Sequence, residues 1–152
     1  MIGHMRHVEM TIAHLMTREP VSLTPRATVG RALAEMNVAG IRHLPIVDRD
    51  QRLIGVVSQR DLLAAASAGD SGRPLAEVMR PDVVSVTPET SAHEAAYLIL
   101  HHGIGCIPVV DRGGRLIGIA TDADFVRVAY VALGGRVPVD QVELEEKEAA
   151  AV

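Results

Sequence analysis

Residues 40–61 read GIRHLPIVDRDQRLIGVVSQRD, and residues 103–124 repeat the pattern as GIGCIPVVDRGGRLIGIATDAD. The two copies align without a gap at an offset of 63 residues, and the match extends upstream to Met16 and Met79. Seventeen of the 47 aligned pairs from residue 16 to residue 62 are identical. Identity of that extent over an ungapped alignment indicates a tandem duplication, in which each copy forms one structural unit.

Length and composition favour a single compact domain made of two halves. The chain has 152 residues and a mass of 16.2 kDa, which is enough for one buried core and too little for a large catalytic domain joined to a regulatory one. The hydrophobic fraction is 48%, but aromatic residues make up only 2%, so Val, Ile, Leu and Ala must fill the core. That composition is typical of buried strands.

Charge and cysteine content exclude several classes of protein. The formal net charge is -4, with no block of Lys and Arg, so nucleic-acid binding is not expected, although small anions remain candidate ligands. Cys106 is the single cysteine and cannot form an internal disulfide. No signal-peptide pattern opens the chain, and no apolar run approaches the about eighteen residues that span a bilayer. We therefore expect a cytoplasmic protein with no membrane insertion.

Local patterns predict the same six elements in each copy. In the first copy they are a helical lead-in at 11–16, a strand at 20–23, a helix at 28–39 closed by Gly40, strands at 44–47 and 53–57, and a helix at 61–66. In the second they are a lead-in at 75–79, a strand at 83–86, a helix at 91–102 closed by Gly103, strands at 109–110 and 116–120, and a helix at 124–133. We therefore predict an α/β (α+β) fold of two helix-strand-helix-strand-strand-helix units packed about a pseudo-twofold axis.

Composition divides the chain into five segments. They are an N-terminal extension at 1–10 that contains a possible cloning remnant, the first repeat at 11–66, a Gly- and Ser-rich linker at 67–74, the second repeat at 75–133, and an acidic tail at 134–152. The linker composition is typical of a surface connection. The acidic tail, which ends in alanine, is expected to fray.

The ordered motifs resemble those of the CBS (cystathionine-β-synthase) domain, and two in tandem resemble a Bateman module. The motifs are MTREPV at 16–21, TP at 24–25, GIRHLPIVD at 40–48 and LIGVVSQRD at 53–61, and their second copies follow in register. The resemblance covers residues 11–133. It implies a non-catalytic regulatory module that senses AMP, ADP, ATP or S-adenosylmethionine, requires no other cofactor, and commonly forms a homodimer arranged as a disc of four repeats.

Each copy ends its hairpin with a hydroxyl and, three residues later, an aspartate. These pairs are Ser58 with Asp61 and Thr121 with Asp124. A hydroxyl at a helix N-cap leaves nearby backbone N–H groups to meet an anion, and the family resemblance assigns the hydroxyl to a phosphate and the carboxylate to the two ribose hydroxyls. The alternative is a plain capping box, which stabilises a helix and binds nothing.

The resemblance also implies two composite sites, each built from both repeats. One combines Ser58 and Asp61 with Arg80, Val84, Ile104, Gly105 and Cys106. The other combines Thr121 and Asp124 with Thr17, Arg18, Val21, Ile41, Arg42 and His43. Taken singly, the apolar members are also consistent with simple core positions. Because Arg42 and His43 belong to the second set, we expect the Thr121 site to prefer phosphorylated ligands.

Other chemistries lack the residues that they need. Seven histidines are present, but no Cys-x-x-Cys or His-Glu-x-x-His spacing accompanies them, so no metal site is expected. Cys106 is interpreted as a packing residue, and no nucleophile with its base emerges, so the chain is not expected to be an enzyme. The alternative to a nucleotide sensor is a structural or interaction protein with vestigial sites that binds a partner enzyme or channel.

A homodimer is also expected from the helices at 28–39 and 91–102. Their Ala, Met, Leu and Ile stripes are interpreted as exposed surfaces that a second chain covers. The effector that such a dimer would regulate lies on another, unknown chain.

Overall fold

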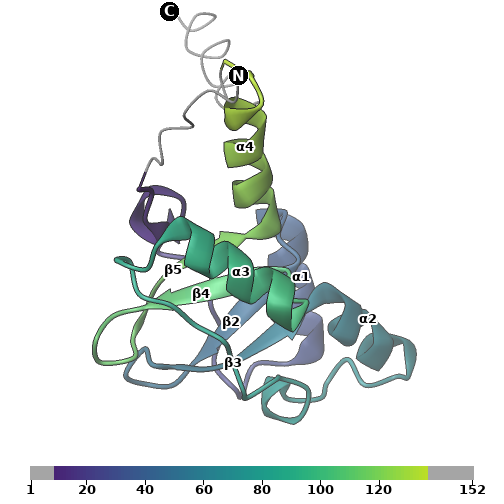
Figure 1. The fold of residues 1–152 in the computed structure, drawn as a ribbon. Helices are drawn as coiled ribbons and strands as arrows, with labels where there is room; N and C mark the ends of the chain where they lie inside the picture. Colours follow the sequence, from purple (N-terminus) through teal and green to yellow (C-terminus); the bar gives the residue numbers. More distant parts are fainter. Residues whose placement is uncertain (1–8, 137–152) are drawn as a thin grey trace, which may run out of the picture.

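The chain forms two similar halves, each built on a β-hairpin with helices around it (Figure 1). The computed structural model describes residues 9–136, so the predictions for the N-terminal extension and for the acidic tail fall mostly outside the described residues. The elements in chain order are η1 (Ile12–His14), β1 (Thr17–Arg18), α1 (Val29–Ala39), β2 (His43–Val47), β3 (Leu53–Ser58), α2 (Gln59–Ser67), η2 (Leu75–Glu77), α3 (Ala92–His102), β4 (Cys106–Val110), β5 (Leu116–Thr121) and α4 (Asp122–Ala132). The predicted α/β fold class is confirmed.

Helix ends follow the local signals in the sequence. The Thr28 hydroxyl accepts a hydrogen bond from Arg31 N at 3.2 Å and begins α1, and the Ser91 hydroxyl accepts one from Glu94 N at 3.3 Å and begins α3. Both helices end at a glycine in the left-handed region, with φ of 67° at Gly40 and 62° at Gly103. A residue with a Cβ would be strained there.

The two hairpins owe their shape to an aspartate at the end of the first strand. Asp48 Oδ1 accepts hydrogen bonds from the backbone N–H groups two and four residues later, at 2.9 and 3.0 Å. Asp111 Oδ1 accepts the equivalent pair at 2.8 and 3.0 Å. The aspartate that ends each LPIVD-like motif is therefore a turn residue, as expected for Asx geometry.

The strands predicted at 20–23 and 83–86 are wrong. Leu23 forms only an isolated parallel bridge to Ile46, and Val86 forms the equivalent bridge to Val109. For either parallel ladder to continue toward the N-terminus of its segment, the central residue of β2 or β4 would have to donate its backbone N–H to that segment. Prolines occupy those positions, at Pro45 and Pro108, so each ladder stops after one bridge.

The lead-in of each repeat packs on the opposite repeat. Ile12 and Met16 belong to the core of the second repeat, whereas Leu75 belongs to the core of the first. β1 accordingly adds an edge strand to the second hairpin, in the order β1-β5-β4, while the first hairpin pairs β2 with β3. The two repeats are therefore held together by an exchange of lead-ins, in which each lead-in packs in the core of the other repeat. The linear order of the repeats does not reveal this exchange.

A glycine in each hairpin accommodates the exchanged lead-in. A Cβ at Gly55 would lie 2.6 Å from Met79 Sδ and 3.2 Å from Arg80 O. A Cβ at Gly118 would lie 2.7 Å from Met16 Sδ and 3.2 Å from the backbone carbonyl oxygen of the residue that follows Met16. The glycine of each LIG motif is thus required by the close approach of a backbone from the other repeat.

The pseudo-twofold axis passes between the two hairpin turns. Arg52 and Arg115 occupy equivalent positions in the repeats and bridge each other in antiparallel fashion. Leu53 N donates to Gly114 O at 3.0 Å, and Leu116 N donates to Gln51 O at 2.9 Å. These reciprocal bonds agree with the predicted pseudo-twofold packing.

The last helices of the two repeats differ in placement. α2 packs along α1 and buries Leu62 completely, whereas α4 stands away from the body of the molecule and buries no residue (Figure 1). None of the helices within residues 9–136 is long and apolar enough to cross a membrane.

The expected exposed stripes on α1 and α3 are wrong. Ala32, Met36, Ala95 and Ile99 lie in the chain's own two cores, with exposed fractions of 8% or less. The apolar residues that recur along both helices therefore pack on the chain's own hairpins.

Candidate functional site

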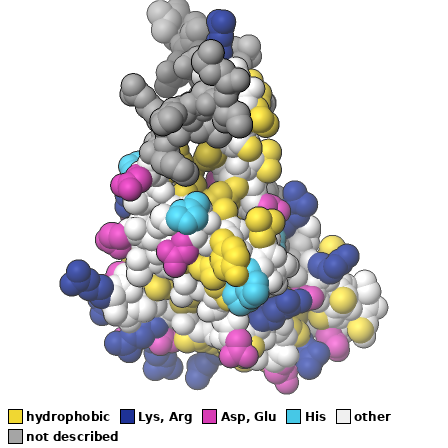
Figure 2. All heavy atoms as spheres, viewed as in Figure 1, with side chains coloured by type: hydrophobic (Ala, Val, Ile, Leu, Met, Phe, Trp, Pro, Cys, Tyr) yellow, Lys and Arg dark blue, Asp and Glu magenta, His cyan; other side chains and the backbone are white. Residues whose placement is uncertain are grey.

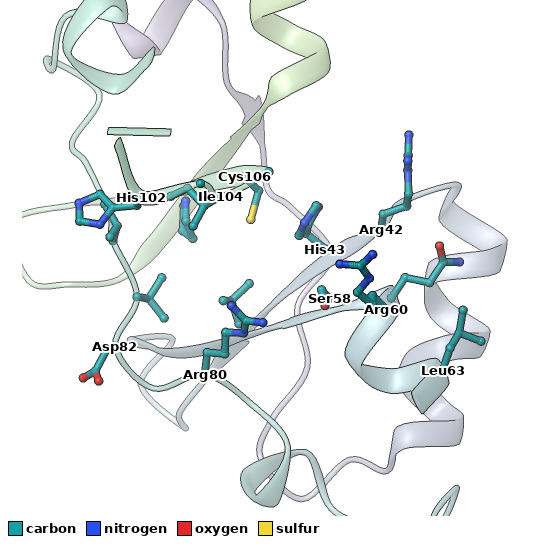
Figure 3. A pocket seen from close by; sticks show the side chains of 17 residues that line it. Arg42, His43, Ser58, Arg60, Leu63, Arg80, Asp82, His102, Ile104 and Cys106 are labelled. Carbon is teal, nitrogen blue, oxygen red and sulfur yellow. The ribbon is translucent and has the colours of Figure 1, made fainter. Parts of the chain in front are cut away.

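A cavity of about 840 Å³ lies between the repeats, at the end of the β2–β3 hairpin (Figure 3). Its volume is in the range of small-molecule sites, which is about 300–1,000 Å³. The lining residues are Arg42, His43, Val56, Ser58, Gln59, Arg60, Leu63, Arg80, Asp82, Val83, Val84, His102, Gly103, Ile104, Gly105, Cys106 and Pro108.

Most of the first predicted set meets in this cavity. Ser58 reaches it from the end of β3, Arg80 and Val84 from the segment after η2, and Ile104, Gly105 and Cys106 from the approach to β4. Asp61 is not among the lining residues. Its Oδ2 is 3.3 Å from both Nε and Nη2 of Arg80, so it holds one of the cavity's arginines.

The N-terminus of α2 opens on the cavity. Ser58 is its N-cap, and the Ser58 hydroxyl accepts a hydrogen bond from Asp61 N at 3.2 Å. Gln59 N donates to Arg42 O at 2.8 Å, which fixes the start of the helix against β2. Two N–H groups of the first turn are thus used within the protein, and it is the positive end of the helix dipole that favours an anion here.

Cationic side chains outnumber acidic ones around the cavity. Arg42, Arg60 and Arg80 line it, together with two histidines, and Asp82 is the acidic member of the lining. Figure 3 places Arg60 and Arg80 on either side of Ser58, whereas Arg42 extends away from it. The arrangement suits a phosphate held at Ser58 between two guanidinium groups.

His43 lines the Ser58 cavity, although the sequence analysis assigned it to the Thr121 set. It pairs with Ser58 across the β2–β3 ladder, and a Cβ at Gly105 would lie 2.8 Å from its Cε1. Gly105 therefore leaves room for the imidazole ring. Arg42 also lines this cavity, and the expected preference of the Thr121 site for phosphorylated ligands stays a prediction.

Burial sets the ionisation of two lining residues. Desolvation lowers the pKa of His43 below its ordinary value; the carboxylate of Asp122 opposes that shift and the charge of Arg42 adds to it. The neutral ring is thus favoured at neutral pH. Desolvation, with a contribution from Asp122, raises the pKa of the Cys106 thiol to about 12, so this cysteine is no thiolate nucleophile.

The pKa shift of His43 predicts a pH dependence of stability. In the unfolded chain the ring is protonated near pH 6.5, whereas in the folded chain its pKa is lower. Protonation therefore favours the unfolded chain, so the free energy of unfolding is greatest above pH 6.5 and decreases as the pH falls below that value. We expect His43→Gln to lose less unfolding free energy than the wild type between pH 7.5 and 5.5 in urea titrations. His93→Gln, at an exposed site on α3, is the control; equal losses in all three proteins would contradict the prediction.

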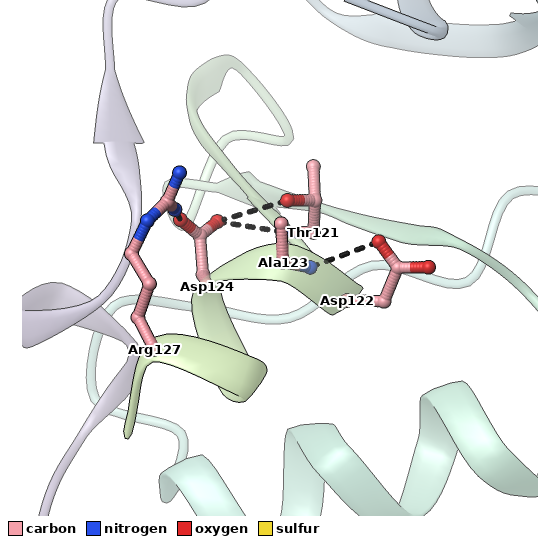
Figure 4. A network of polar contacts seen from close by, with 5 residues as sticks. All are labelled: Thr121, Asp122, Ala123, Asp124 and Arg127. Carbon is pink, nitrogen blue, oxygen red and sulfur yellow. Dashed lines mark hydrogen bonds and ion pairs between the residues drawn. The ribbon is translucent and has the colours of Figure 1, made fainter. Parts of the chain in front are cut away.

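The second predicted set is differently arranged (Figure 4). Asp124 Oδ2 accepts hydrogen bonds from Thr121 N at 2.8 Å and from Thr121 Oγ1 at 3.3 Å, while Asp124 Oδ1 pairs with Arg127 Nη1 at 2.7 Å. The Asp124 side chain is only 14% exposed. Its carboxylate is therefore engaged by its own helix, as in the capping-box alternative.

The remaining members of the second set lie on or just after β1, beside β5, and at the start of β2. Thr17 and Arg18 pair with Ile119 and Gly118 in the β1–β5 ladder. Val21 is 39% exposed, and Ile41 packs against the core of the first repeat. Arg42 and His43 line the Ser58 cavity, as described above.

Several lining residues lie outside the predicted sets. Gln59 and Arg60 fill the variable positions of the Ser-x-x-Asp motif, and their place in the first helical turn could have revealed them. Leu63 follows one turn later. Asp82, Val83 and His102 carry no local signal, because only the packing of the repeats brings them to the cavity.

Among the described residues, 9–136, no group of three or more His, Cys, Asp or Glu side chains could hold a metal ion.

Comparison with known proteins identifies the family. The family model of the CBS domain matches residues 12–68 and 75–130, which together cover most of the chain. The chain belongs to the CBS-domain family. Both matched segments contain one of the hairpins and the helix that follows it, so the predicted resemblance is confirmed.

Solved CBS structures resemble this chain over most of its length. The AcuB protein of Vibrio cholerae is 41% identical, with a TM-score of 0.73 over 92% of this chain and 98% of its own. CBSX2, crystallised in complex with AMP, is 31% identical, with a TM-score of 0.74 over 81% of this chain and 98% of its own. The cytosolic domain of the Mg²⁺ channel MgtE, in complex with ATP, is 37% identical, with a TM-score of 0.70 over 79% of this chain and 49% of its own.

Several curated relatives are much longer than this CBS pair. The magnesium transporter MgtE of Thermus thermophilus is 37% identical over 128 residues, and the match spans 81% of this chain but 28% of the transporter. CBS pairs thus occur within larger proteins whose other domains this match does not include.

Proposed function

We propose that this CBS pair is a non-catalytic regulatory module that binds an adenosine nucleotide in the Ser58 cavity. The observation that carries the proposal is the meeting of Arg60, Arg80 and the N-terminus of α2 around Ser58 in a cavity of about 840 Å³. Two relatives that cover the CBS pair were crystallised with AMP and with ATP. A nucleotide is the ligand class that fits both facts.

Each part of the cavity has a role in this proposal. The phosphate lies at Ser58, where the positive end of the α2 dipole attracts it and the guanidinium groups of Arg60 and Arg80 provide charge-assisted hydrogen bonds. Asp61 accepts the ribose hydroxyls after Arg80 turns from it to the phosphate. The apolar side chains of Val84 and Ile104 form the wall for the adenine base.

Occupancy is transmitted by movement of one repeat relative to the other. The cavity takes residues from both repeats, so a ligand that contacts both favours the arrangement in which they approach most closely. The effector is another protein chain, and the setting is cytoplasmic. We also propose that the module acts as a homodimer of four repeats, arranged as a disc.

The second candidate function is that of an interaction protein with vestigial nucleotide sites. The observation that favours it is Asp124, whose carboxylate is already engaged by Thr121 and Arg127. Under this alternative, the chain binds a partner enzyme or channel without a nucleotide.

A thermal-shift titration with AMP, ADP, ATP and S-adenosylmethionine separates the two functions. A ligand at 100 times its Kd stabilises the folded chain by about 2.7 kcal/mol, which raises the melting temperature by several degrees. Absence of any shift at millimolar nucleotide would refute the sensor proposal and support the interaction protein.

Asp61→Asn tests the ribose contact. Asparagine keeps the size of the side chain but replaces one carboxylate oxygen, an acceptor for a ribose hydroxyl, with an amide donor. We therefore expect AMP affinity to fall about tenfold, with a change in unfolding free energy below about 1 kcal/mol. Calorimetry and urea denaturation of the same variant measure both quantities. Unchanged affinity with a large loss of stability would instead identify Asp61 as a purely structural residue.

A further inference from the structure

His43 is the one histidine among residues 9–136 that the fold partly buries. Within this range the other histidines are exposed, and they are His14, His93, His101 and His102. Figure 2 shows histidine side chains at the surface over α3, whereas Figure 3 shows the ring of His43 inside the cavity between the repeats. A titratable ring that is partly buried in a ligand cavity is a candidate for a functional role.

On one side, His43 faces the position proposed for the phosphate. It lies directly opposite Ser58 in the antiparallel β2–β3 ladder. Directly opposite residues have their side chains on the same face of the sheet, with Cβ atoms about 4.5–5.5 Å apart. A phosphate held at Ser58 would therefore lie within reach of the imidazole ring.

On the other side, His43 packs against the second repeat at the start of α4. A Cβ at Gly105 would lie 2.8 Å from Cε1 of the ring and 3.0 Å from Nε2. The carbonyl oxygen of Gly105 accepts a hydrogen bond from Asp122 N at 3.1 Å, which holds the first residue of α4 beside the ring. His43 thus links the Ser58 cavity to the helix that begins at the second predicted site.

The charged groups around the ring act on it in opposite directions. The carboxylate of Asp122 favours the protonated ring, and the guanidinium of Arg42, the preceding residue, favours the neutral one. Cys106 stays neutral, because burial raises the pKa of its thiol to about 12. The other charged or titratable side chains of the lining are Arg60, Arg80, Asp82 and His102.

The duplication provides an internal comparison for the pair formed by His43 and Asp122. At the offset of 63 residues, His43 corresponds to Cys106, and Asp122 corresponds to Gln59. The equivalent pair on the other side of the pseudo-twofold axis therefore consists of a neutral thiol and an amide. The packing of the repeats does not by itself require ionisable groups at these two positions, so the histidine and the aspartate have a role beyond packing.

We propose that His43 couples nucleotide binding in the Ser58 cavity to the uptake of a proton, so that the module responds to pH as well as to the nucleotide. Desolvation lowers the pKa of His43 and outweighs the carboxylate of Asp122, which favours the neutral ring. A phosphate at Ser58 adds negative charge close to the ring, and an opposite charge within about 4–6 Å favours the protonated form. Binding therefore promotes protonation, and by reciprocity a lower pH strengthens binding.

The inference rests on the nucleotide proposed for the Ser58 cavity, and calorimetry with AMP tests it. Titrations at pH 6.5 in PIPES and in Bis-Tris, which release different heats on losing a proton, give the number of protons taken up. Wild type should take up on the order of half a proton per AMP more than His43→Gln, since one ring contributes at most about one proton. Between pH 7.5 and 6.0, the affinity of wild type for AMP should rise about threefold more than that of His43→Gln.

His93→Gln, at an exposed site on α3, is the matched control and should take up as many protons as wild type. The phosphate of AMP itself titrates near pH 6, as phosphate monoesters do. Its contribution is common to the three proteins, so the difference between wild type and His43→Gln isolates the ring.

NMR of the imidazole ring tests the coupling in the wild-type chain. The His43 signal is assigned by its loss in His43→Gln, and the midpoint of its titration should rise when AMP saturates the protein. Asp122→Asn should lower this midpoint both with and without AMP, because the carboxylate that favours the charged ring is removed.

The outcomes separate the coupling from the nucleotide site. If AMP binds but the His43 midpoint stays or falls, or if wild type and His43→Gln take up the same number of protons, the coupling is overturned and the nucleotide site stands. Absence of binding by AMP, ADP and ATP at both pH 6.0 and pH 7.5 would overturn the coupling and the nucleotide site together.

Discussion

Leu75→Ala is expected to destabilise the protein by about 2–5 kcal/mol, the usual cost of removing a fully buried leucine side chain. Leu75 lies after the linker, yet its side chain is completely buried in the core of the first repeat together with Val29, Met36 and Leu44. Its backbone N also donates to Ala27 O at 2.8 Å. The loss of stability should therefore appear as unfolding of the whole chain in one transition.

Urea denaturation followed by circular dichroism measures this effect. Val38→Ala, at a site 85% exposed on α1, is the matched control and should stay within about 0.5 kcal/mol of the wild type. If each repeat were self-contained, Leu75→Ala would instead leave the first repeat intact and produce two separate transitions.

The sequence predicted best the features that depend on neighbouring residues. Gly40 and Gly103 end their helices, and Asp48 and Asp111 organise their turns, through contacts that span at most five residues. Such contacts follow from local chemistry alone. The exchange of lead-ins escaped prediction because both repeats carry the same apolar pattern, so the pattern fits either core equally well.

The candidate site shows the same division. Ser58 and Asp61 were indicated by a motif and a family resemblance, whereas the position of Arg42 and His43 depended on strand pairing. Alternate residues of a strand face opposite sides of the sheet. A strand residue can therefore be assigned to a site only when the register of its strand with the neighbouring strand is known. His102 and Asp82 required the packing of whole repeats and had no local signal.

Arg80→Glu is expected to weaken AMP binding by on the order of 100-fold, and AMP is expected to bind with one molecule per chain. Hydrogen bonds to charged groups contribute about 1.5–3 kcal/mol, and the variant replaces such a donor with a charge of the same sign as the phosphate. Asp61, now 3.3 Å from the Arg80 guanidinium, would also face a second carboxylate. A loss of about 2.7 kcal/mol corresponds to the expected factor.

Calorimetry on three variants locates the site that binds AMP. Arg112→Glu makes the same change of charge on the exposed turn between β4 and β5 and should bind AMP within about twofold of the wild type. Asp124→Ala should do the same, because the Asp124 carboxylate is held by Thr121 and Arg127 and lies outside the lining of the Ser58 cavity. Loss of AMP binding in Asp124→Ala, with binding to Arg80→Glu unaffected, would place the nucleotide at the Thr121 site and refute the assignment of the phosphate to Ser58.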